Sequence, residues 1–456
     1  MKIIAERVVV SISAKASAGH RDRRTPVVVV AGLHGDPAET AGLVAGALGA
    51  ADGTVIVRHD LTELRQGIVR RTVHSAGKTS ESVHELAHGC VSCTLKADLL
   101  PLLCTLAARA SVHRIVLALD PAFEAEAVCE GIAEIPVTGI VGRVDGPAAR
   151  DVRVAAVVTA IDVCMWTAAA TGDATLEELG WAWADDDRTV AQLAVGQVDF
   201  ADALVVVGGA DVDPLERARS GAVLSRLAPT APVLWPESAA AITPAAMDAL
   251  LSLVPPESRR GRIFDAHAPL LRGRPPLGAD NGVELVEFAA RRPFHPERLH
   301  GALDMLFDGV VTARGRIWLA TQPDEVVWLE SAGGGLRIGG AGRWLAAMSA
   351  DERAAADPER LAMAGMRWDE RFGDRDISLV ILVHDADPNE IREALHWALV
   401  DDTELLQVER APQLVARWPD PFGEWHTDPC ATDEPDPATA GEARGTETGE
   451  RARKEK

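Results

Sequence analysis

Short runs of β-branched and other apolar residues alternate with longer, helix-like apolar segments through the first half of the chain. The runs lie at 26–31, 54–58, 114–119, 152–159, 203–207 and 232–234. Continuous apolar runs of this length are typical of strands buried on both faces of a parallel sheet. Helices are predicted between them at 41–50, 96–110, 188–200 and 214–227. This alternation predicts an α/β fold with a doubly wound, mostly parallel sheet and helices on both faces.

The pattern changes after a stretch rich in Pro, Gly and Arg. Beyond it, strands are predicted at 283–289, 310–320, 325–331 and 377–384, and helices at 293–306 and 388–399. A glycine-rich turn at 333–335 favours antiparallel pairing. We therefore expect a second, smaller α+β domain. Packing in its core is the preferred interpretation for Trp318, Trp328 and Trp344, over an exposed interaction face.

These patterns divide the chain into five parts. They are an N-terminal extension 1–25, an α/β domain 26–254, a linker 255–282, an α+β domain 283–411 and a tail 412–456. From residue 431 the tail is acidic and rich in Pro, Gly and Thr, so it buries too little apolar surface to order itself. We expect the tail to be mostly disordered.

Charge and cysteine content narrow the classes of function. The formal net charge of −22 repels phosphate backbones, which argues against direct binding of nucleic acid. No uninterrupted apolar run reaches the roughly 18 residues of a membrane span. Cys104, Cys129 and Cys164 lie in apolar segments that predict core positions. This usage of cysteine indicates a reducing, cytoplasmic environment.

A Cys-x-x-Cys pair, Cys90 and Cys93, precedes an apolar helical segment. Two thiols at this spacing can turn back on one soft cation, and Thr94 is placed to cap the helix that follows. A closed zinc site needs four ligands, and His88 and His84 are the nearby imidazoles. The pair predicts zinc binding by Cys90, Cys93 and His88. The alternative is two ordinary loop cysteines beside solvated histidines.

Several motifs, in this order, resemble the CobW-like family of P-loop GTPases and zinc metallochaperones. Residues 89–93 match the family's Gly-Cys-x-Cys-Cys motif with Ser92 at the middle cysteine. Residues 197–207 resemble the segment that leads into the family's Asn-Lys-x-Asp motif, which recognises the guanine base and is called the guanine reader below. Residues 292–299, 313–320 and 373–375 resemble the C-terminal domain. The resemblance covers about 26–405. It implies a P-loop-type α/β domain with zinc, GTP and magnesium as ligands.

The phosphate-binding loop departs from the family pattern. A P-loop needs a lysine to neutralise phosphate charge and a hydroxyl residue for Mg²⁺. At the matching positions stand Pro37 for glycine, Ala38 for lysine and Glu39 for the hydroxyl residue. Pro37 removes an N–H that would hold phosphate, and Glu39 brings negative charge toward an anion.

Two further nucleotide motifs are eroded. The guanine reader is replaced by 208–211, which keeps only the aspartate, and 119–122 lack the family's Glu-Thr-x-Gly pattern. We therefore interpret the domain as a pseudo-GTPase. The residues that the resemblance still implies for nucleotide contact are Gly32, Gly35, Thr40 and Asp211.

Within this family the chain most resembles an actinobacterial branch. Its known member recruits a ribosome-hibernation protein to ribosomes when zinc is scarce. The resemblance implies a cytoplasmic, zinc-linked protein whose partners, the hibernation factor and the ribosome, are bound through protein contacts. The alternative is a GTP-binding and hydrolysing zinc metallochaperone. A third interpretation is an α/β protein whose cysteines bind nothing.

Overall fold

The computed structural model describes residues 22–86, 91–181, 186–210, 212–263 and 266–423 of the 456-residue chain. The chain forms two compact units. The first comprises Met1–Phe264 with Arg272–Pro276, and the second comprises Asp265–Leu271 with Leu277–Lys456. The chain passes between the two units three times, each time within 264–277, inside the segment predicted as a linker.

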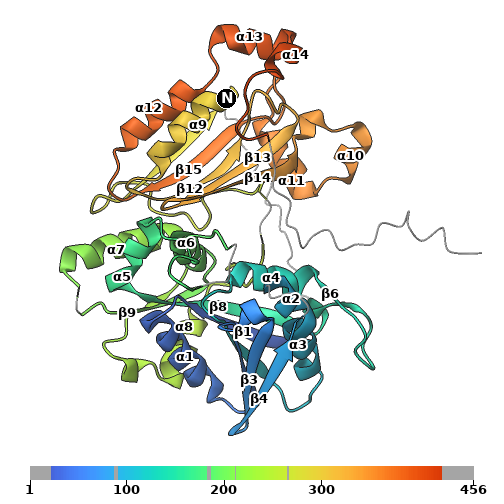
Figure 1. The fold of residues 1–456 in the computed structure, drawn as a ribbon, viewed down its shortest axis with the longest axis vertical. Helices are drawn as coiled ribbons and strands as arrows, with labels where there is room; N and C mark the ends of the chain where they lie inside the picture. The colour runs from blue at the N-terminus through green and yellow to red at the C-terminus, as the bar shows by residue number, and fades with distance from the viewer. Residues whose placement is uncertain (1–21, 87–90, 182–185, 211, 264–265, 424–456) are drawn as a thin grey trace, which may run out of the picture. The chain divides into compact units, whose positions relative to one another are not determined.

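The first unit is built on an eight-stranded sheet with the order β10-β9-β8-β1-β5-β2-β3-β4 (Figure 1). The strands from β10 to β2 run parallel, and β3 and β4 continue the sheet as an antiparallel hairpin. This confirms the predicted doubly wound, mostly parallel sheet. The strands are β1 (Thr25–Gly32), β2 (Thr54–Asp60), β3 (Ile68–Ser75), β4 (Lys78–Glu85), β5 (Arg114–Ala118), β8 (Val152–Asp162), β9 (Ala203–Val207) and β10 (Val233–Leu234), with a separate pair β6 (Pro136–Val137) and β7 (Gly146–Pro147).

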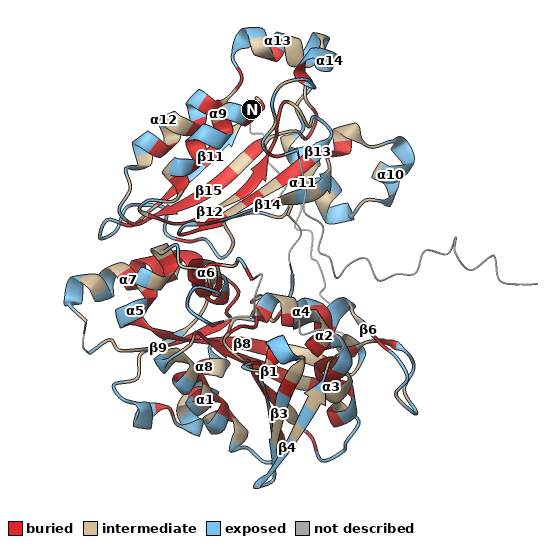
Figure 2. Cartoon of the chain, viewed as in Figure 1, coloured by how far each residue is buried: buried red, intermediate tan, exposed pale blue. Residues whose placement is uncertain are grey.

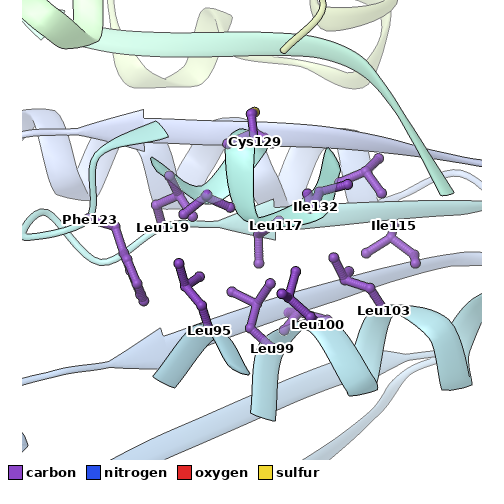
Figure 3. Packing of buried hydrophobic residues seen from close by; sticks show 14 of the residues in the cluster. Leu95, Leu99, Leu100, Leu103, Ile115, Leu117, Leu119, Phe123, Cys129 and Ile132 are labelled. Carbon is purple, nitrogen blue, oxygen red and sulfur yellow. The ribbon is translucent and has the colours of Figure 1, made fainter. Parts of the chain in front are cut away.

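Helices cover both faces of this sheet. One face of the sheet packs on α1 and α8, and the other face packs on α3 and α4. Successive residues of β1 therefore point into different cores. Val28 and Val30 lie in the core with α1 and α8, and Val27 and Val29 lie in the core with α3 and α4. Figure 2 shows the central strands mostly buried, and Figure 3 shows leucines before and along α3 meeting β5 and α4. The helical elements are α1 (Asp36–Gly49), η1 (Leu64–Gln66), α2 (Val91–Thr94), η2 (Leu95–Leu99), α3 (Leu100–Ala107), α4 (Ala125–Glu134), η3 (Ala148–Arg150), α5 (Val163–Thr171), α6 (Val190–Asp199), α7 (Pro214–Leu227), η4 (Ala239–Ala241) and α8 (Pro244–Ser252).

The second unit is an antiparallel sheet with the order β11-β15-β12-β13-β14, as expected for an α+β domain. Trp318 and Trp344 are buried in its core, which confirms core packing for two of the three tryptophans. Its elements are β11 (Glu284–Ala290), α9 (Pro296–Ala302), η5 (Leu303–Leu306), β12 (Val310–Ile317), β13 (Glu325–Ala332), β14 (Gly335–Arg343), η6 (Leu345–Ala347), α10 (Ala350–Ala355), α11 (Pro358–Arg367), β15 (Ile377–Val383), α12 (Pro388–Ala398), α13 (Asp402–Arg410) and α14 (Pro412–Val415).

The structure differs from the expected tail at residues 412–423. Phe422 is buried in the core of the second unit. The Asp420 carboxylate accepts hydrogen bonds from Thr321 and, at 3.0 Å, from Gln322. Phe422, the buried Val415, the Trp418 ring stacked on His295 and the Asp420 carboxylate therefore hold a segment that lacks hydrophobic periodicity. The part of the tail beyond residue 423 lies outside the described residues.

No helix in the described ranges is both long enough and apolar enough to cross a bilayer.

Candidate functional site

The loop between β1 and α1 is a tight turn. Helix α1 begins at Asp36, inside the stretch that would wrap a phosphate in a P-loop. Gly32 lies so close to this helix that a Cβ there would stand 2.5 Å from the carbonyl oxygen of Pro37. Gly35 has a φ of 84°, which glycine adopts without strain. Both glycines therefore serve the turn itself.

The first turn of α1 offers little to an anion. Pro37 has no N–H, and the amides of Ala38 and Glu39 both donate to the carbonyl of Gly35, at 3.0 and 3.2 Å. Asp36 and Glu39 place negative charge at the same end of the helix. Thr40 is buried, with 6% of its surface exposed. This geometry is unfavourable for a triphosphate, which needs open amides and positive charge.

A pocket of about 320 Å³ opens where β1, β2 and β5 end. The carboxyl edge of a doubly wound sheet is where such folds bind ligands. Two carboxyl groups, Asp120 and Glu177, and one guanidinium, Arg65, line the pocket. Arg65 lies 3.8 Å from Glu177, and Asp120 has no guanidinium partner among the lining residues. It is lined by His34, Leu61, Thr62, Leu64, Arg65, Asp120, Ala122, Glu177, Gly180 and Trp181.

Two titratable side chains, His34 and Asp120, line this pocket. Burial raises the pKa of Asp120, although its carboxylate accepts the amides of Leu61 at 3.1 Å and Ala122 at 3.0 Å. Burial lowers the pKa of His34, against the attraction of Asp120. The imidazole of His34 lies 4.8 Å from the Trp181 ring, between centroids. An imidazole whose pKa is lowered, an indole and a carboxyl group whose pKa is raised thus occupy the place where a P-loop protein concentrates positive charge.

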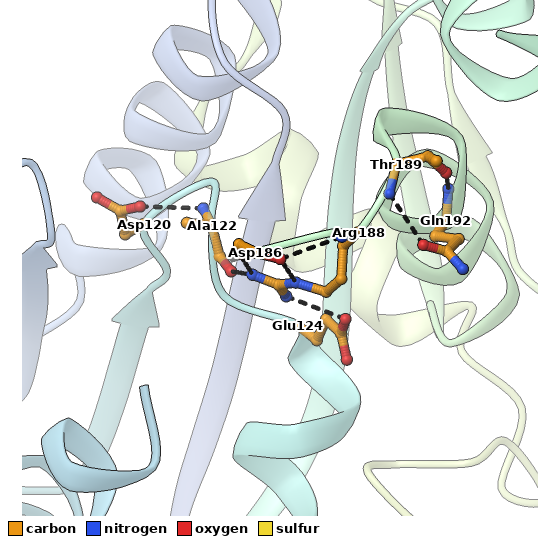
Figure 4. Close-up of polar contacts among 7 residues, drawn as sticks. All are labelled: Asp120, Ala122, Glu124, Asp186, Arg188, Thr189 and Gln192. Carbon is orange, nitrogen blue, oxygen red and sulfur yellow. Dashed lines mark hydrogen bonds and ion pairs between the residues drawn. The ribbon is translucent and has the colours of Figure 1, made fainter. Parts of the chain in front are cut away.

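Arg188 makes polar contacts with the loop after β5, which contributes Asp120 and Ala122 to the pocket (Figure 4). Its guanidinium donates to Glu124 at 3.0 Å, to Asp186 at 2.7 Å and to the carbonyl of Ala122 at 3.2 Å. The hydrogen bonds to Asp186 and the charge of Glu124 raise the pKa of Arg188 despite its burial. Arg188 therefore joins the chain before α6 to the loop after β5. It is committed to this structural role and does not replace the missing lysine.

The loop after β9 occupies the position of the guanine reader. Gly208 has a φ of 78°, and the guanidinium of Arg217 donates to the Gly209 carbonyl at 3.3 Å while lying 4.7 Å from the Trp235 ring centroid. Asp211, the predicted base contact, lies outside the described residues.

The cysteine motif leads directly into a helical run. Cys93 lies in α2 and is partly exposed, whereas Cys90 and His88 lie outside the described residues. The predicted cap is wrong: Thr94 has helical angles of −60° and −44°, lies inside the run and makes no side-chain cap bond. The run begins earlier than expected, at Val91, so Thr94 falls one turn inside it.

A buried polar cluster lies just beyond the motif. The π-helical turn η2 carries Asp98, whose carboxylate lies 2.7 Å from Nε2 of His59, 3.5 Å from Nε2 of His84 and in an ion pair with Arg71. Burial opposes ionisation, but the hydrogen bond with His59 and the three basic partners hold the pKa of Asp98 below its ordinary value. Asp98 thereby joins the helix after the cysteines to β2, β3 and β4.

Sequence reasoning missed most of this cluster. It considered His84 only as an imidazole near the cysteines, and it assigned no role to His59, Arg71 or Asp98. The available signal was one carboxylate within the apolar run that follows Cys93. Among the residues that the structure describes, no three Cys, His, Asp or Glu side chains converge on one metal-holding point.

The remaining cysteines divide by exposure. Burial raises the pKa of Cys104 to about 11 and that of Cys129 further, so both are inert core thiols as predicted. The core prediction for Cys164 is wrong, because this residue is exposed. It lies in the first turn of α5, where the chain leaves the carboxyl end of β8, and its Sγ lies 3.5 Å from the Gly208 carbonyl.

Comparison with known proteins identifies both halves of the chain. Residues 56–234 match the nucleotide-binding domain of CobW/HypB/UreG, and residues 283–399 match the C-terminal domain of the cobalamin synthesis protein CobW. The first match begins after Gly32–Thr40, so the glycine loop lies outside it.

Individual relatives extend over most of the chain. The Mycobacterium tuberculosis protein named zinc chaperone Rv0106 is 46% identical over 412 residues, covering 89% of this chain and 95% of its own. The zinc-regulated GTPase metalloprotein activator 1 of Dictyostelium discoideum is 25% identical over 339 residues, covering 72% of this chain and 68% of its own. A crystal structure of the Zn(II)-bound YjiA GTPase from E. coli matches 83% of this chain and 99% of its own with 13% identity and a TM-score of 0.34. The chain belongs to the CobW family, in which a CobW/HypB/UreG nucleotide-binding domain precedes a CobW C-terminal domain.

Proposed function

We propose that this chain is a cytoplasmic zinc-handling protein of the CobW family that does not use GTP in the manner of a P-loop enzyme. The proposal that the chain does not use GTP rests on the geometry of the loop before α1. Its amides at 38 and 39 are already bonded to Gly35, and Glu39 stands where a hydroxyl would meet Mg²⁺.

Zinc is the cargo in this proposal. Two relatives bear names that refer to zinc, one as a chaperone and one as a zinc-regulated activator. Cys93 supplies a partly exposed thiol, and a thiolate is among the preferred ligands of Zn²⁺. We propose that Cys90 and His88 supply the next ligands. Ser92 replaces a family cysteine, so we expect weaker binding than by a three-thiol motif.

Zinc competition against a chromophoric chelator tests this assignment. Tetrahedral zinc sites are worth about 10–16 kcal/mol in total, so losing one of four ligands costs about 3 kcal/mol, or about a hundredfold in affinity. We expect Cys93→Ser to lose about that much. The matched control is Cys164→Ser, which removes another exposed thiol and should bind zinc like the wild type. Equal zinc affinity of Cys93→Ser and the wild type would refute the assignment.

The alternative function is a GTP-binding and hydrolysing zinc metallochaperone. It is supported by the family match and by Asp120, which follows β5 and lines the pocket. It requires another cation to replace the lysine. Arg65, the cation that lines the pocket, pairs with Glu177, and Arg188 is held by Asp186 and Glu124. The described geometry therefore favours the pseudo-GTPase.

We further propose that the protein recruits a ribosome-hibernation factor to ribosomes when zinc is limiting. The supporting observations are the resemblance to that actinobacterial branch and the net charge of −22, which favours protein contacts over RNA contacts. A protein with a silenced nucleotide site is also better suited to docking than to turnover. Zinc can switch such a protein only as far as its affinity differs between the two states.

Affinity purification from zinc-starved and zinc-replete cells tests this partner assignment. We expect ribosomal proteins and a hibernation factor to accompany the protein from starved cells and to fall at least about tenfold in replete cells, the range of ordinary allosteric coupling. The Cys93→Ser variant should lose the difference between the two conditions. Absence of ribosomal proteins from the starved sample would exclude recruitment, while leaving the zinc assignment intact.

A further inference from the structure

A small polar pocket lies wholly within the second unit. Its volume is about 30 Å³. Since one water-sized atom needs roughly 10–15 Å³, the pocket has room for about two such atoms. The charged and aromatic side chains that line it are His267, Arg316, Trp344, Arg360, Arg367, Asp374 and Asp376, and the His267 ring meets the Trp344 ring edge-on at 6.4 Å between centroids.

The charges of this pocket favour an anion. Asp374 accepts the amides of Leu345 and Ala346, both at 2.9 Å, so its oxygens are committed to holding η6. Asp376 lies 3.8 Å from both Arg316 and Arg367. Three guanidinium groups thus meet two carboxylates. The Asp374 carboxylate accepts backbone amides, and Arg316 donates to the carbonyls of Ala266 and Ala268, so Arg360 and Arg367 supply the remaining positive charge.

Two donors at this pocket have no acceptor within the described chain. The indole Nε1–H of Trp344 is buried and without a hydrogen-bond partner, and so is the Nε–H of Arg360. Trp344 is 1% exposed, so bulk water does not reach its indole. Arg360 donates through another nitrogen to the Arg343 carbonyl, which fixes the position of its guanidinium. Buried donors of this kind are rarely left without an acceptor.

We propose that this pocket binds a small oxyanion, the carboxylate or phosphate head of a ligand. An oxyanion accepts hydrogen bonds from both unpaired donors, and it carries the negative charge that the guanidinium groups of the lining favour. The two oxygens of a carboxylate match the available volume. A phosphate is too large for this volume, so only some of its oxygens would lie inside the pocket. The site lies outside the crevice of the first unit and does not depend on the proposed function.

The indole N–H signal of Trp344 provides a direct test. Acetate and, separately, inorganic phosphate are titrated into the full-length ¹⁵N-labelled protein at constant ionic strength, with the signal assigned by its absence in Trp344→Phe. We expect a saturable downfield shift, because the indole gains an acceptor. Tighter binding of acetate would identify a carboxylate as the natural head group, and tighter binding of phosphate would identify a phosphate.

Arg360→Gln and Arg392→Gln form a matched pair for this titration. Arg392 belongs to the same unit but lies on α12, where it pairs with Glu284 at 3.2 Å. We expect Arg360→Gln to weaken oxyanion binding about tenfold or more, since it removes a charge-assisted donor, and Arg392→Gln to leave it unchanged. The proposal is overturned if neither anion shifts the Trp344 signal saturably, or if both variants weaken binding equally.

Discussion

Replacing Asp98 with asparagine is expected to destabilise the first unit by about 3 kcal/mol, because it removes the buried carboxylate that pairs with Arg71 and bonds to His59. His59 is 1% exposed at its side chain and pairs with Asp98 at 2.7 Å. The side chain of Arg71 is 20% exposed, so water can solvate its guanidinium once the carboxylate is gone. We therefore expect a loss of stability at the lower end of the usual range for breaking a buried ion pair. The same change removes the link between the helix after Cys93 and strands β2 and β3.

Hydrogen exchange of the buried amides in β2 and β5 measures this loss, since it reports on the first unit alone. Its pH dependence follows from the lowered pKa of Asp98. The stabilisation is fully present above the ordinary carboxyl pKa of 3.8 and is lost as the pH falls through the lower folded value. The difference in free energy of unfolding between the wild type and Asp98→Asn is therefore expected to be constant near neutral pH. It should shrink as the pH falls below 3.8.

Asp248→Asn is the matched control for this prediction. Asp248 lies in the same unit, 3.9 Å from Arg114, but its side chain is 66% exposed. Such a pair contributes less than about 1 kcal/mol. Replacing Arg71 by glutamine in the Asp98→Asn background should restore part of the lost stability, because the stranded guanidinium is gone. Similar losses in Asp98→Asn and Asp248→Asn would show that the cluster does not hold the unit together.

The sequence predicts the central strands well because their signal is local. β1, β5, β8 and β9 are apolar runs buried on both faces, and each was placed within a few residues. The β3–β4 hairpin was missed because its residues are mostly polar and exposed at the edge of the sheet. A strand held mainly by backbone pairing leaves little trace in hydrophobic periodicity.

The candidate site is harder to predict because its contacts are distant in sequence. Asp98 meets His59 across 39 positions and Arg71 across 27, and no spacing rule connects them. The missing lysine and the proline of the glycine loop, in contrast, are visible in the sequence alone. What the structure adds is that the loop is closed as well as uncharged. Gly32 packs on Pro37, and the Gly35 carbonyl takes the amides of the first turn.

Restoring the loop should therefore restore nucleotide binding. We expect the wild type to show no calorimetric binding of millimolar GTP with Mg²⁺. In the triple variant Pro37→Gly, Ala38→Lys, Glu39→Ser, a lysine contact is gained and a repulsive carboxylate is lost. Each change is worth about 1.5–3 kcal/mol, so affinity should rise by about two to four orders of magnitude. Pro37→Gly adds the amide that proline withholds.

A charge control separates the loop from general electrostatics. Leu43→Lys places the same charge on an exposed position of the same helix and should leave GTP unbound. Tight binding of GTP by the wild type would contradict the pseudo-GTPase, and equal gains in Leu43→Lys and the triple variant would assign the effect to net charge. Binding by the triple variant alone would show that the crevice keeps the shape for a nucleotide. It would then follow that the loss of a lysine, a hydroxyl and an open amide from this loop is what prevents GTP binding.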